Sequence, residues 1–311
     1  MKLSTLTAAV TTALMITAIP LTAQELVIIH TNDTHSQIDP DEDGLGGIGR
    51  RKVVIDSIRE AHDNVLLIDA GDAVQGTLYF NIFGGKVEQR LMNELGYDMR
   101  ILGNHEFDNG VDSLAAVLSE AKAHFIATNY NLDDSPLEDI FEKYEIREID
   151  DHKVGFIGIN LRPAGMISEG NYDGVEYLDA VEAANATAWW LRNIEGCDLV
   201  VAITHIGYNP VTPPGDLMLA ANSSNIDIFI GGHSHDLILP GNQYYQHRVL
   251  NAAGKEVLVT QVGKAGKNVG EIVIDLDSKE AEYKVIPIDK RLDDRVPLEI
   301  KDMIKPYRTG V

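Results

Sequence analysis

Short apolar runs alternate with helical stretches along most of this chain, and no other sequence feature limits the possible folds as strongly. The runs are rich in branched aliphatic residues, as buried strands are. Strands are predicted at residues 26–30, 65–69, 124–128, 154–160, 199–204, 226–231 and 256–260. Apolar residues recur with helical spacing at residues 49–61, 86–95, 112–121 and 180–194. Strands that alternate with helices favour an α/β architecture, here in a single domain.

The pattern changes after Gly270. The segments EIVIDLD and EAEYKVIPID predict an antiparallel pair of strands. Residues 297–311 are charged and contain two prolines, so we expect a short helix or a tail there. The expected division is a main domain at residues 24–290, followed by a linker or tail at residues 291–311.

The first 23 residues have the layout of a secretory signal peptide. Lys2 supplies a positive start, an apolar stretch rich in Ala, Thr and Leu follows, and the small residue Ala23 precedes Gln24. A membrane anchor is the alternative, but the stretch is short for a span and is interrupted by threonines. We expect cleavage and export, which would make the protein secreted or periplasmic, with no membrane span in the mature chain.

The charge balance is acidic, because 48 aspartates and glutamates outnumber 26 lysines and arginines, for a net charge of −22. A protein that coats nucleic acid needs a basic surface, so we do not expect that function. A small phosphorylated substrate stays compatible with this balance, because a local metal charge can outweigh it. The single cysteine, Cys197, excludes intrachain disulfides and cysteine-rich zinc sites.

Polar motifs lie at the ends of five apolar stretches, which are four of these runs and the short stretch Arg100-Ile101-Leu102. They read Thr31-Asn32-Asp33-Thr34-His35, Gly71-Asp72, Gly103-Asn104-His105-Glu106-Phe107-Asp108, Thr204-His205 and Gly231-Gly232-His233-Ser234-His235. Open α/β sheets place their sites in the crevice beyond the carboxyl ends of the strands. These motifs can therefore converge in space although they lie far apart in the sequence.

The motifs offer nitrogen and oxygen ligands that suit borderline divalent metals. Seven of their residues are candidate ligands, namely two aspartates, one asparagine and four histidines: Asp33, Asp72, Asn104, His35, His205, His233 and His235. The set is too large for one tetrahedral ion and suits two, with a shared carboxylate and a bridging water that becomes a hydroxide nucleophile. Two metals about 3.5–4 Å apart form the usual clamp for phosphoryl displacement.

The order D-x-H, G-D, G-N-H-E-F-D, H and G-H-x-H resembles the metallophosphoesterase (calcineurin-like) superfamily. The NHEFD motif and the DAGDAVQGT stretch around Asp72 are similar to the 5′-nucleotidase family within it. The resemblance covers roughly residues 26–289. It implies a four-layer α/β/β/α sandwich, in which two sheets pack face to face with helices outside.

The resemblance also implies a site with two divalent metal ions, drawn from Mn, Zn, Co, Fe and Mg. Asp33, His35 and His235 would bind one ion. Asn104, His205 and His233 would bind the other, and Asp72 would bridge the two.

Two further roles follow from the same resemblance. His105 would contact the phosphate and stabilise charge on it or on the leaving oxygen, and Asp108 would orient His105. Arg162 follows the strand predicted at 154–160 and could face the cleft, since arginine suits phosphate recognition. Its alternative role is that of a surface residue in the turn before Pro163.

Members of this family usually carry a second, C-terminal domain whose aromatic residues stack on the nucleobase. This chain ends at Val311, about where the linker to that domain would begin, so we expect that domain to be absent here or to be supplied by a separate polypeptide. The expected function is an exported phosphatase for phosphate monoesters, above all 5′-nucleotides, in which a metal-bound hydroxide attacks phosphorus in line.

Two alternatives stay open at this point. The same metal core serves phosphodiester and pyrophosphate substrates, so a 2′,3′-cyclic-nucleotide phosphodiesterase or a UDP-sugar hydrolase fits the motifs equally well. A subunit that is inactive without a separate C-terminal-domain partner is the non-enzyme alternative.

Overall fold

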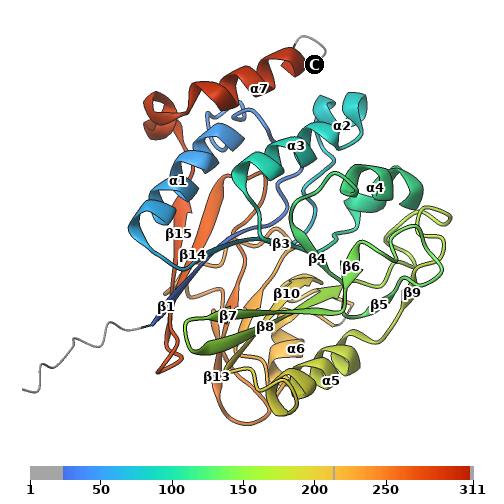
Figure 1. Ribbon diagram of the computed structural model, residues 1–311, viewed down its shortest axis with the longest axis vertical. Helices are drawn as coiled ribbons and strands as arrows, with labels where there is room; N and C mark the ends of the chain where they lie inside the picture. Colours follow the sequence, from blue (N-terminus) through green and yellow to red (C-terminus); the bar gives the residue numbers. More distant parts are fainter. Residues whose placement is uncertain (1–23, 213, 309–311) are drawn as a thin grey trace, which may run out of the picture.

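The computed structural model describes residues 24–212 and 214–308 (Figure 1). The predicted signal peptide lies outside the described residues. Within them, no helix is long and apolar enough to cross a membrane.

The described chain forms two large sheets. The first contains β1 (Glu25–Thr31), β2 (Val65–Asp69), β3 (Met99–Arg100), β4 (His124–Ile126), β6 (Phe141–Glu142), β14 (Asn268–Asp275) and β15 (Ala281–Pro287). Their order is β15-β14-β1-β2-β3-β4-β6, and the strands from β1 to β6 run parallel. The predicted antiparallel pair after Gly270 is confirmed, because β14 pairs antiparallel with both β1 and β15.

The second sheet contains β7 (Tyr144–Ile149), β8 (His152–Asn160), β10 (Leu199–His205), β11 (Ile228–Ile230), β12 (Arg248–Leu250) and β13 (Glu256–Thr260). Its order is β12-β13-β11-β10-β8-β7, with a parallel centre and an antiparallel strand at each edge. A separate small pair joins β5 (Tyr130–Asn131) to β9 (Glu176–Tyr177).

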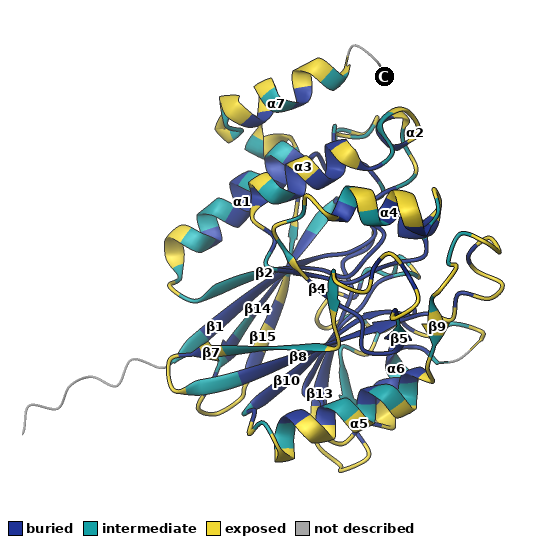
Figure 2. Ribbon diagram, turned by 45° about the vertical axis from the view of Figure 1, so that its right-hand side comes forward, coloured by how far each residue is buried: buried dark blue, intermediate teal, exposed yellow. Residues whose placement is uncertain are grey.

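Helices cover the outer face of each sheet (Figure 2). The first sheet carries α1 (Ile48–Ala61), α2 (Leu78–Phe83), α3 (Lys86–Leu95), α4 (Val111–Leu118) and α7 (Leu298–Arg308), and the second carries α5 (Ala180–Asn193) and α6 (Asp216–Ala221). Short 3-10 helices lie at His105–Phe107 and Lys290–Arg295. The expected four-layer α/β/β/α sandwich is therefore confirmed.

Alternation along the central strands explains the layers. In β1, Leu26 and Ile28 face the other sheet, whereas Val27 and Ile29 face the helices on the outer side. All four are fully buried, because successive strand residues point to opposite faces and both faces are covered. This double burial is why the strand reads as a continuous apolar run.

Three predicted elements agree with the structure at both ends: β2, β13 and α3. The strand predicted at 124–128 is two residues too long. After Ile126 the chain leaves the first sheet, and the Thr128 N–H donates to the Gly158 carbonyl of β8 in the second sheet. The strand predicted at 226–231 and the helix predicted at 112–121 are likewise longer than β11 and α4.

Several short or edge elements were not predicted, among them α2, α6 and β7. Helices α2 and α6 have six residues each, which is too short for a helical period to show, so tertiary packing stabilises them. Strand β7 reads YEIREI and is only half-buried at the edge of its sheet, so it lacks the apolar run of a buried strand.

The C-terminal segment contains a helix. Helix α7 buries Ile300 and Ile304 against the apolar layer that α1 and α3 also contact. The 3-10 helix before it is attached to α1, because Arg50 Nε donates a hydrogen bond to Asp293 Oδ1 at 2.6 Å. Of the two predicted forms, a short helix or a tail, the helix is the one observed at 298–308; the domain boundaries stay a prediction.

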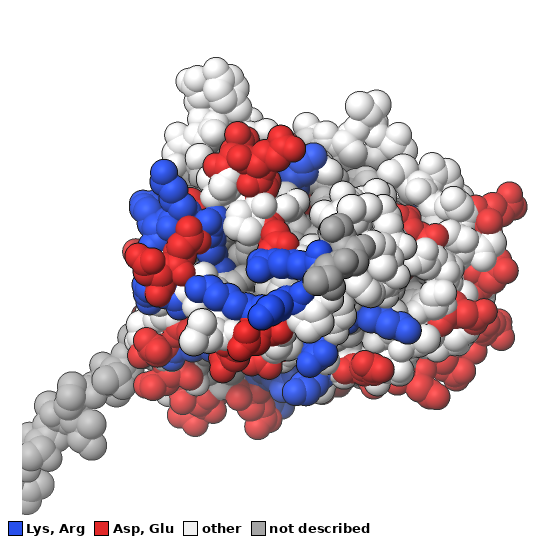
Figure 3. All heavy atoms as spheres, turned by 90° about the horizontal axis from the view of Figure 1, so that it is seen from above, with Lys and Arg blue, Asp and Glu red and all other residues white. Residues whose placement is uncertain are grey.

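The surface has charges of both signs. On the face shown in Figure 3, basic and acidic side chains are interspersed, and no unbroken basic surface covers that face.

Candidate active site

The polar motifs meet where the carboxyl ends of the parallel strands of both sheets come together. Asp33, Asp72 and Asn104 follow β1, β2 and β3 of the first sheet, whereas His205 ends β10 and His233 follows β11 of the second. The ring nitrogens and carboxylate oxygens of the motifs form small groups, and within each group these atoms all lie within 4.8 Å of one another.

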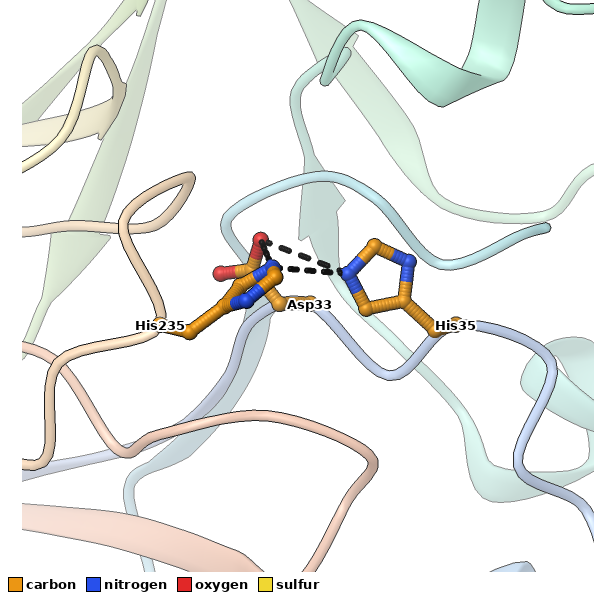
Figure 4. Close-up of side chains that lie close together, drawn as sticks. All are labelled: Asp33, His35 and His235. Carbon is orange, nitrogen blue, oxygen red and sulfur yellow. Dashed lines mark hydrogen bonds and ion pairs between the residues drawn. The ribbon is translucent and has the colours of Figure 1, made fainter. Parts of the chain in front are cut away.

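One group contains Asp33, His35 and His235 (Figure 4). His35 and His235 turn their Nε2 atoms toward each other at 2.9 Å. Both nitrogens also approach Asp33 Oδ1, at 3.8 Å from His35 and 3.4 Å from His235. Two ring nitrogens and a carboxylate oxygen directed at one point are a donor set for a divalent cation.

A second group contains Asp72, His205 and His233. Asn104 joins it, because its Oδ1 lies 3.0 Å from His233 Nδ1. His205 Nε2 lies 3.2 Å from Asp72 Oδ2 and 4.0 Å from Asp33 Oδ1. Asp33 and Asp72 therefore lie between the two groups of histidines.

His205 provides the test of whether a cation fits. It is fully buried, and its Nδ1 donates to the Ala70 carbonyl at 2.6 Å, which leaves Nε2 without a hydrogen-bond partner. Burial would lower the pKa of His205, but the carboxylates of Asp72 and Asp33 raise it to about 10. An unpaired ring nitrogen that faces two carboxylates is the environment of a metal ligand, so these residues fit divalent metals.

The other titratable groups agree with that donor set. Burial and the neighbouring His205 lower the pKa of His233 to about 4, so its imidazole is neutral near pH 7 and can ligate. Burial would raise the pKa of Asp72, but His205 beside it lowers the pKa below its usual range. Neutral histidines and ionised aspartates are the forms that bind metal.

The loops that carry these groups have uncommon backbone conformations. Positive φ angles occur at Asp33, His35, Asp72, His233 and His235. Such conformations cost about 1–3 kcal/mol each and persist where the surroundings hold them, which is common at functional sites.

Glycines beside the motifs allow the two sheets to approach. A Cβ at Gly232 would lie 2.8 Å from His205 Nδ1 and 2.9 Å from the Ala70 carbonyl oxygen. A Cβ at Gly103 would lie 2.1 Å from Asp72 Oδ1. The close packing of ligand loops thus needs glycine at both positions.

Two residues that the sequence did not single out as site residues hold the loops. The buried Glu106 carboxylate accepts hydrogen bonds from the N–H groups of Asp72, Ala73 and Gly103, so it joins the β2 and β3 loops. Asn32 donates to Asp33 Oδ2 at 2.6 Å and to the Gly263 carbonyl. Their positions inside the NHEFD and TNDTH motifs were the available hints.

His105 lies beside the cluster. Its backbone N–H donates to Asp72 Oδ1. Its ring Nδ1 lies 3.0 Å from Asp108 Oδ2, which fits the expected orienting pair. His105 also forms a third group with His35 and Asp72, so its distances alone allow a ligand role as well as a phosphate-contacting one.

Arg162 lies outside the cluster, on a cavity of about 530 Å³ that His233 also lines. Its guanidinium carbon lies 4.6 Å from the centre of the Tyr177 ring. Tyr177 lies in the short β9 strand, where the sequence has no motif, and only the tertiary structure shows it beside Arg162.

The comparisons with known proteins agree with this geometry. The calcineurin-like phosphoesterase family model matches residues 26–237. The snake venom 5′-nucleotidase of Naja atra is 32% identical over 277 residues, which cover 82% of this chain and 51% of that protein. The human 5′-nucleotidase is 31% identical over 279 residues, which cover 83% of this chain and 47% of that protein. The chain spans about half the length of these relatives.

Solved structures show the same fold. The 5′-nucleotidase precursor of Thermus thermophilus superposes with a TM-score of 0.81 at 30% identity, covering 92% of this chain and 59% of that one. The calcineurin-like phosphoesterase YfkN of Bacillus subtilis has a TM-score of 0.74 at 26% identity, covering 92% of this chain and 97% of that one. The expected family resemblance is thereby confirmed, and the chain belongs to the calcineurin-like phosphoesterase family.

Proposed function

We propose that this chain is an exported phosphatase that uses two divalent metal ions to hydrolyse phosphate monoesters, with 5′-nucleotides as its substrates. The observation that carries the proposal is the convergence of seven candidate nitrogen and oxygen ligands. One of them is His205, whose buried Nε2 faces two carboxylates. The 5′-nucleotidase names of the relatives support the substrate class.

In this proposal, Asp33, His35 and His235 would hold one ion. Asn104, His205 and His233 would hold the other, and Asp72 would be shared between them. The ions, when bound, polarise the phosphoryl oxygens and supply an activated water.

The chain's own side chains position the substrate and balance charge. His105, fixed by Asp108, stands at the edge of the cluster, where it can donate a hydrogen bond to the phosphate or to the leaving oxygen. Glu106 keeps the loops of Asp72 and Asn104 in register, because it accepts N–H groups from both loops. Arg162 would contact the substrate from the adjoining cavity.

A broader phosphoester range is the second candidate. A Bacillus subtilis relative, 28% identical over 308 residues, is named a trifunctional nucleotide phosphoesterase. Cyclic nucleotides and UDP-sugars therefore belong in any substrate test.

The test is a phosphatase screen on the purified chain. Nucleoside 5′-monophosphates, 2′,3′-cyclic nucleotides, a UDP-sugar and an aryl phosphate are supplied with Mn²⁺, Zn²⁺, Co²⁺ or Mg²⁺, and released phosphate or nucleoside is measured. We expect the monophosphates to be turned over, and we expect a metal chelator to abolish this turnover. An Asp72→Asn variant, which replaces the proposed bridging carboxylate with a neutral amide, is the matched control. If no substrate is turned over with any metal, the proposal is wrong for this chain.

A further inference from the structure

One cavity adjoins the proposed metal centre without being part of it. Its volume is about 530 Å³, within the usual range for small-molecule sites of roughly 300–1,000 Å³. His233 lines one part of it, and Leu161, Arg162, Met166, Tyr177 and Ile206 line other parts. A phosphate held at the metal centre would thus place the rest of its molecule beside this cavity.

Arg162 is distinctive among the arginines. Within the described residues, each of the other arginines hydrogen-bonds an oxygen atom or forms an ion pair with a carboxylate, such as Gln89 for Arg100 and Glu145 for Arg147. Arg162 is exposed, and its described contact is the face of Tyr177. Its hydrogen-bond donors and the second face of its planar guanidinium are therefore free for a ligand.

The Tyr177 ring under this guanidinium is itself fixed by packing and by a hydrogen bond. The ring packs edge-on against Tyr130 at 6.4 Å, and the two tyrosines are paired in register between β5 and β9. The Tyr177 hydroxyl accepts the N–H of Ala180 at the start of α5 at 3.3 Å. We call Arg162 and Tyr177 together the Arg–Tyr ledge.

The lining of the cavity indicates what the ledge binds. Most of the lining side chains are apolar, including Leu161, Met166 and Ile206. A second phosphate would meet few donors there, and the Asp179 carboxylate lines the same cavity and would repel it. Flat aromatic rings suit both the apolar walls and the guanidinium plane, on which nucleobases stack.

We propose that the Arg–Tyr ledge binds the aromatic base of the leaving group, so that this chain contains its own determinant of nucleotide preference. The proposal rests on the proposed function for the position of the phosphate. It assigns Arg162 a stacking role, in which the plane of the guanidinium matters as well as its charge.

The first test compares two substrates that share the same ester. Values of kcat/KM are measured for adenosine 5′-monophosphate and for ribose 5-phosphate, which lacks the base. We expect the wild-type protein to favour the nucleotide. Arg162→Lys keeps the positive charge but removes the planar guanidinium group. It should lower the ratio of kcat/KM for the nucleotide to kcat/KM for ribose 5-phosphate about tenfold, which is the order of one stacking contact. Tyr177→Leu should lower the ratio similarly, and Tyr177→Phe should retain it.

The second test needs no catalysis. Binding of adenosine to protein freed of metal by a chelator is measured by calorimetry, with ribose as the reference ligand. Arg162→Lys should weaken adenosine binding, whereas Arg295→Lys, which changes an exposed arginine bonded to Ser57, is the matched control and should not.

The outcomes separate the two proposals. Absence of turnover with either substrate contradicts the phosphatase function, while adenosine binding still decides the role of the ledge. An active wild-type protein without preference for the nucleotide overturns the ledge. The ledge proposal is also overturned if Arg162→Lys retains the ratio of the two kcat/KM values and Arg162→Leu changes it. The charge of Arg162, rather than stacking, would then act on the substrate.

Discussion

His205 has the most constrained position of any side chain in the site. Its Nδ1 is committed to the Ala70 carbonyl, and its Nε2 points at two aspartates inside a layer that excludes water. A proton or a metal cation can satisfy that nitrogen, and the ring cannot turn away without leaving the Ala70 carbonyl unpaired. The chemistry of the site therefore depends on which cation occupies this position.

Proton competition predicts that metal binding tightens as pH rises. The pKa of His205 is raised to about 10 without metal, so a metal ion must displace its proton at neutral pH. We expect affinity to fall by up to about tenfold for each pH unit below neutrality for this one proton. Chelator-competition titrations at pH 6 and pH 8 measure the effect. An affinity that is equal at both values would contradict a ligand role for His205.

His105 tests the division between ligands and phosphate-contacting residues. Replacement of His105 by alanine should lower kcat at least a hundredfold, a usual cost for loss of one charge-stabilising donor, and leave metal content near that of the wild-type protein. Elemental analysis together with kinetics measures both. Loss of metal would instead assign His105 to the group that it forms with His35 and Asp72. His124→Gln, at an exposed histidine, is the control.

At the scale of elements, strand ends and short loops position the candidate ligands. The strands contribute little chemistry themselves, but their parallel alignment brings the loops after β1, β2 and β3 to one edge. Glycine at position 103 and the hydrogen bonds accepted by Glu106 then hold the Asp72 and Asn104 loops together. A slight shift of one loop would separate candidate ligand atoms that now lie within hydrogen-bonding distance of one another.

Helix α7 provides a stability prediction for a single element. Ile300 is fully buried beneath the helix, and Leu298 on the same helix is 75% exposed. Ile300→Ala should lower the free energy of unfolding by about 2–5 kcal/mol, because it removes buried apolar contacts and leaves a cavity. Leu298→Ala should change it by less than about 0.5 kcal/mol. Urea unfolding of both variants measures the difference, and equal effects would show that α7 does not pack on the domain in solution.

At the scale of the whole molecule, the proposed ligands come from both sheets. The loops of the first sheet carry Asp33, His35, Asp72 and Asn104, and the second sheet supplies His205, His233 and His235. Bound metal would connect the two halves of the sandwich, which otherwise meet through the apolar layer that includes Ile28, Val201 and Ile203. It would also place positive charge in a protein whose net charge is −22.

Metal binding should therefore stabilise the whole fold. At a free metal concentration of about 100 Kd, a ligand that binds only the native state contributes about 2.7 kcal/mol. We expect a higher Tm with Mn²⁺ or Zn²⁺ than in chelator, and a smaller shift for His205→Asn. Differential scanning calorimetry measures both. An unchanged Tm in protein that demonstrably contains metal would contradict a site that spans the two sheets.

Local patterns were sufficient for the fold class, and they supplied the candidate ligands, whose roles stay a prediction. The apolar runs of β1 and β10 reveal buried strands because both faces of these strands are covered. The motifs after them identify candidate ligands because metals need particular atoms at the ends of strands. Predictions failed where packing outweighs local preference, as in the six-residue helices α2 and α6 and in the exit of the chain after Ile126.

Only the tertiary structure could decide which groups face each other. The distances between His35 and His235, the unpaired nitrogen of His205 and the stacking of Arg162 on Tyr177 each join residues from separate elements. No local periodicity encodes such contacts, because they depend on how two sheets pack face to face and on loops with positive φ angles. The amino-acid order therefore determines which ligands the chain offers, and the packing of the two sheets determines where they meet.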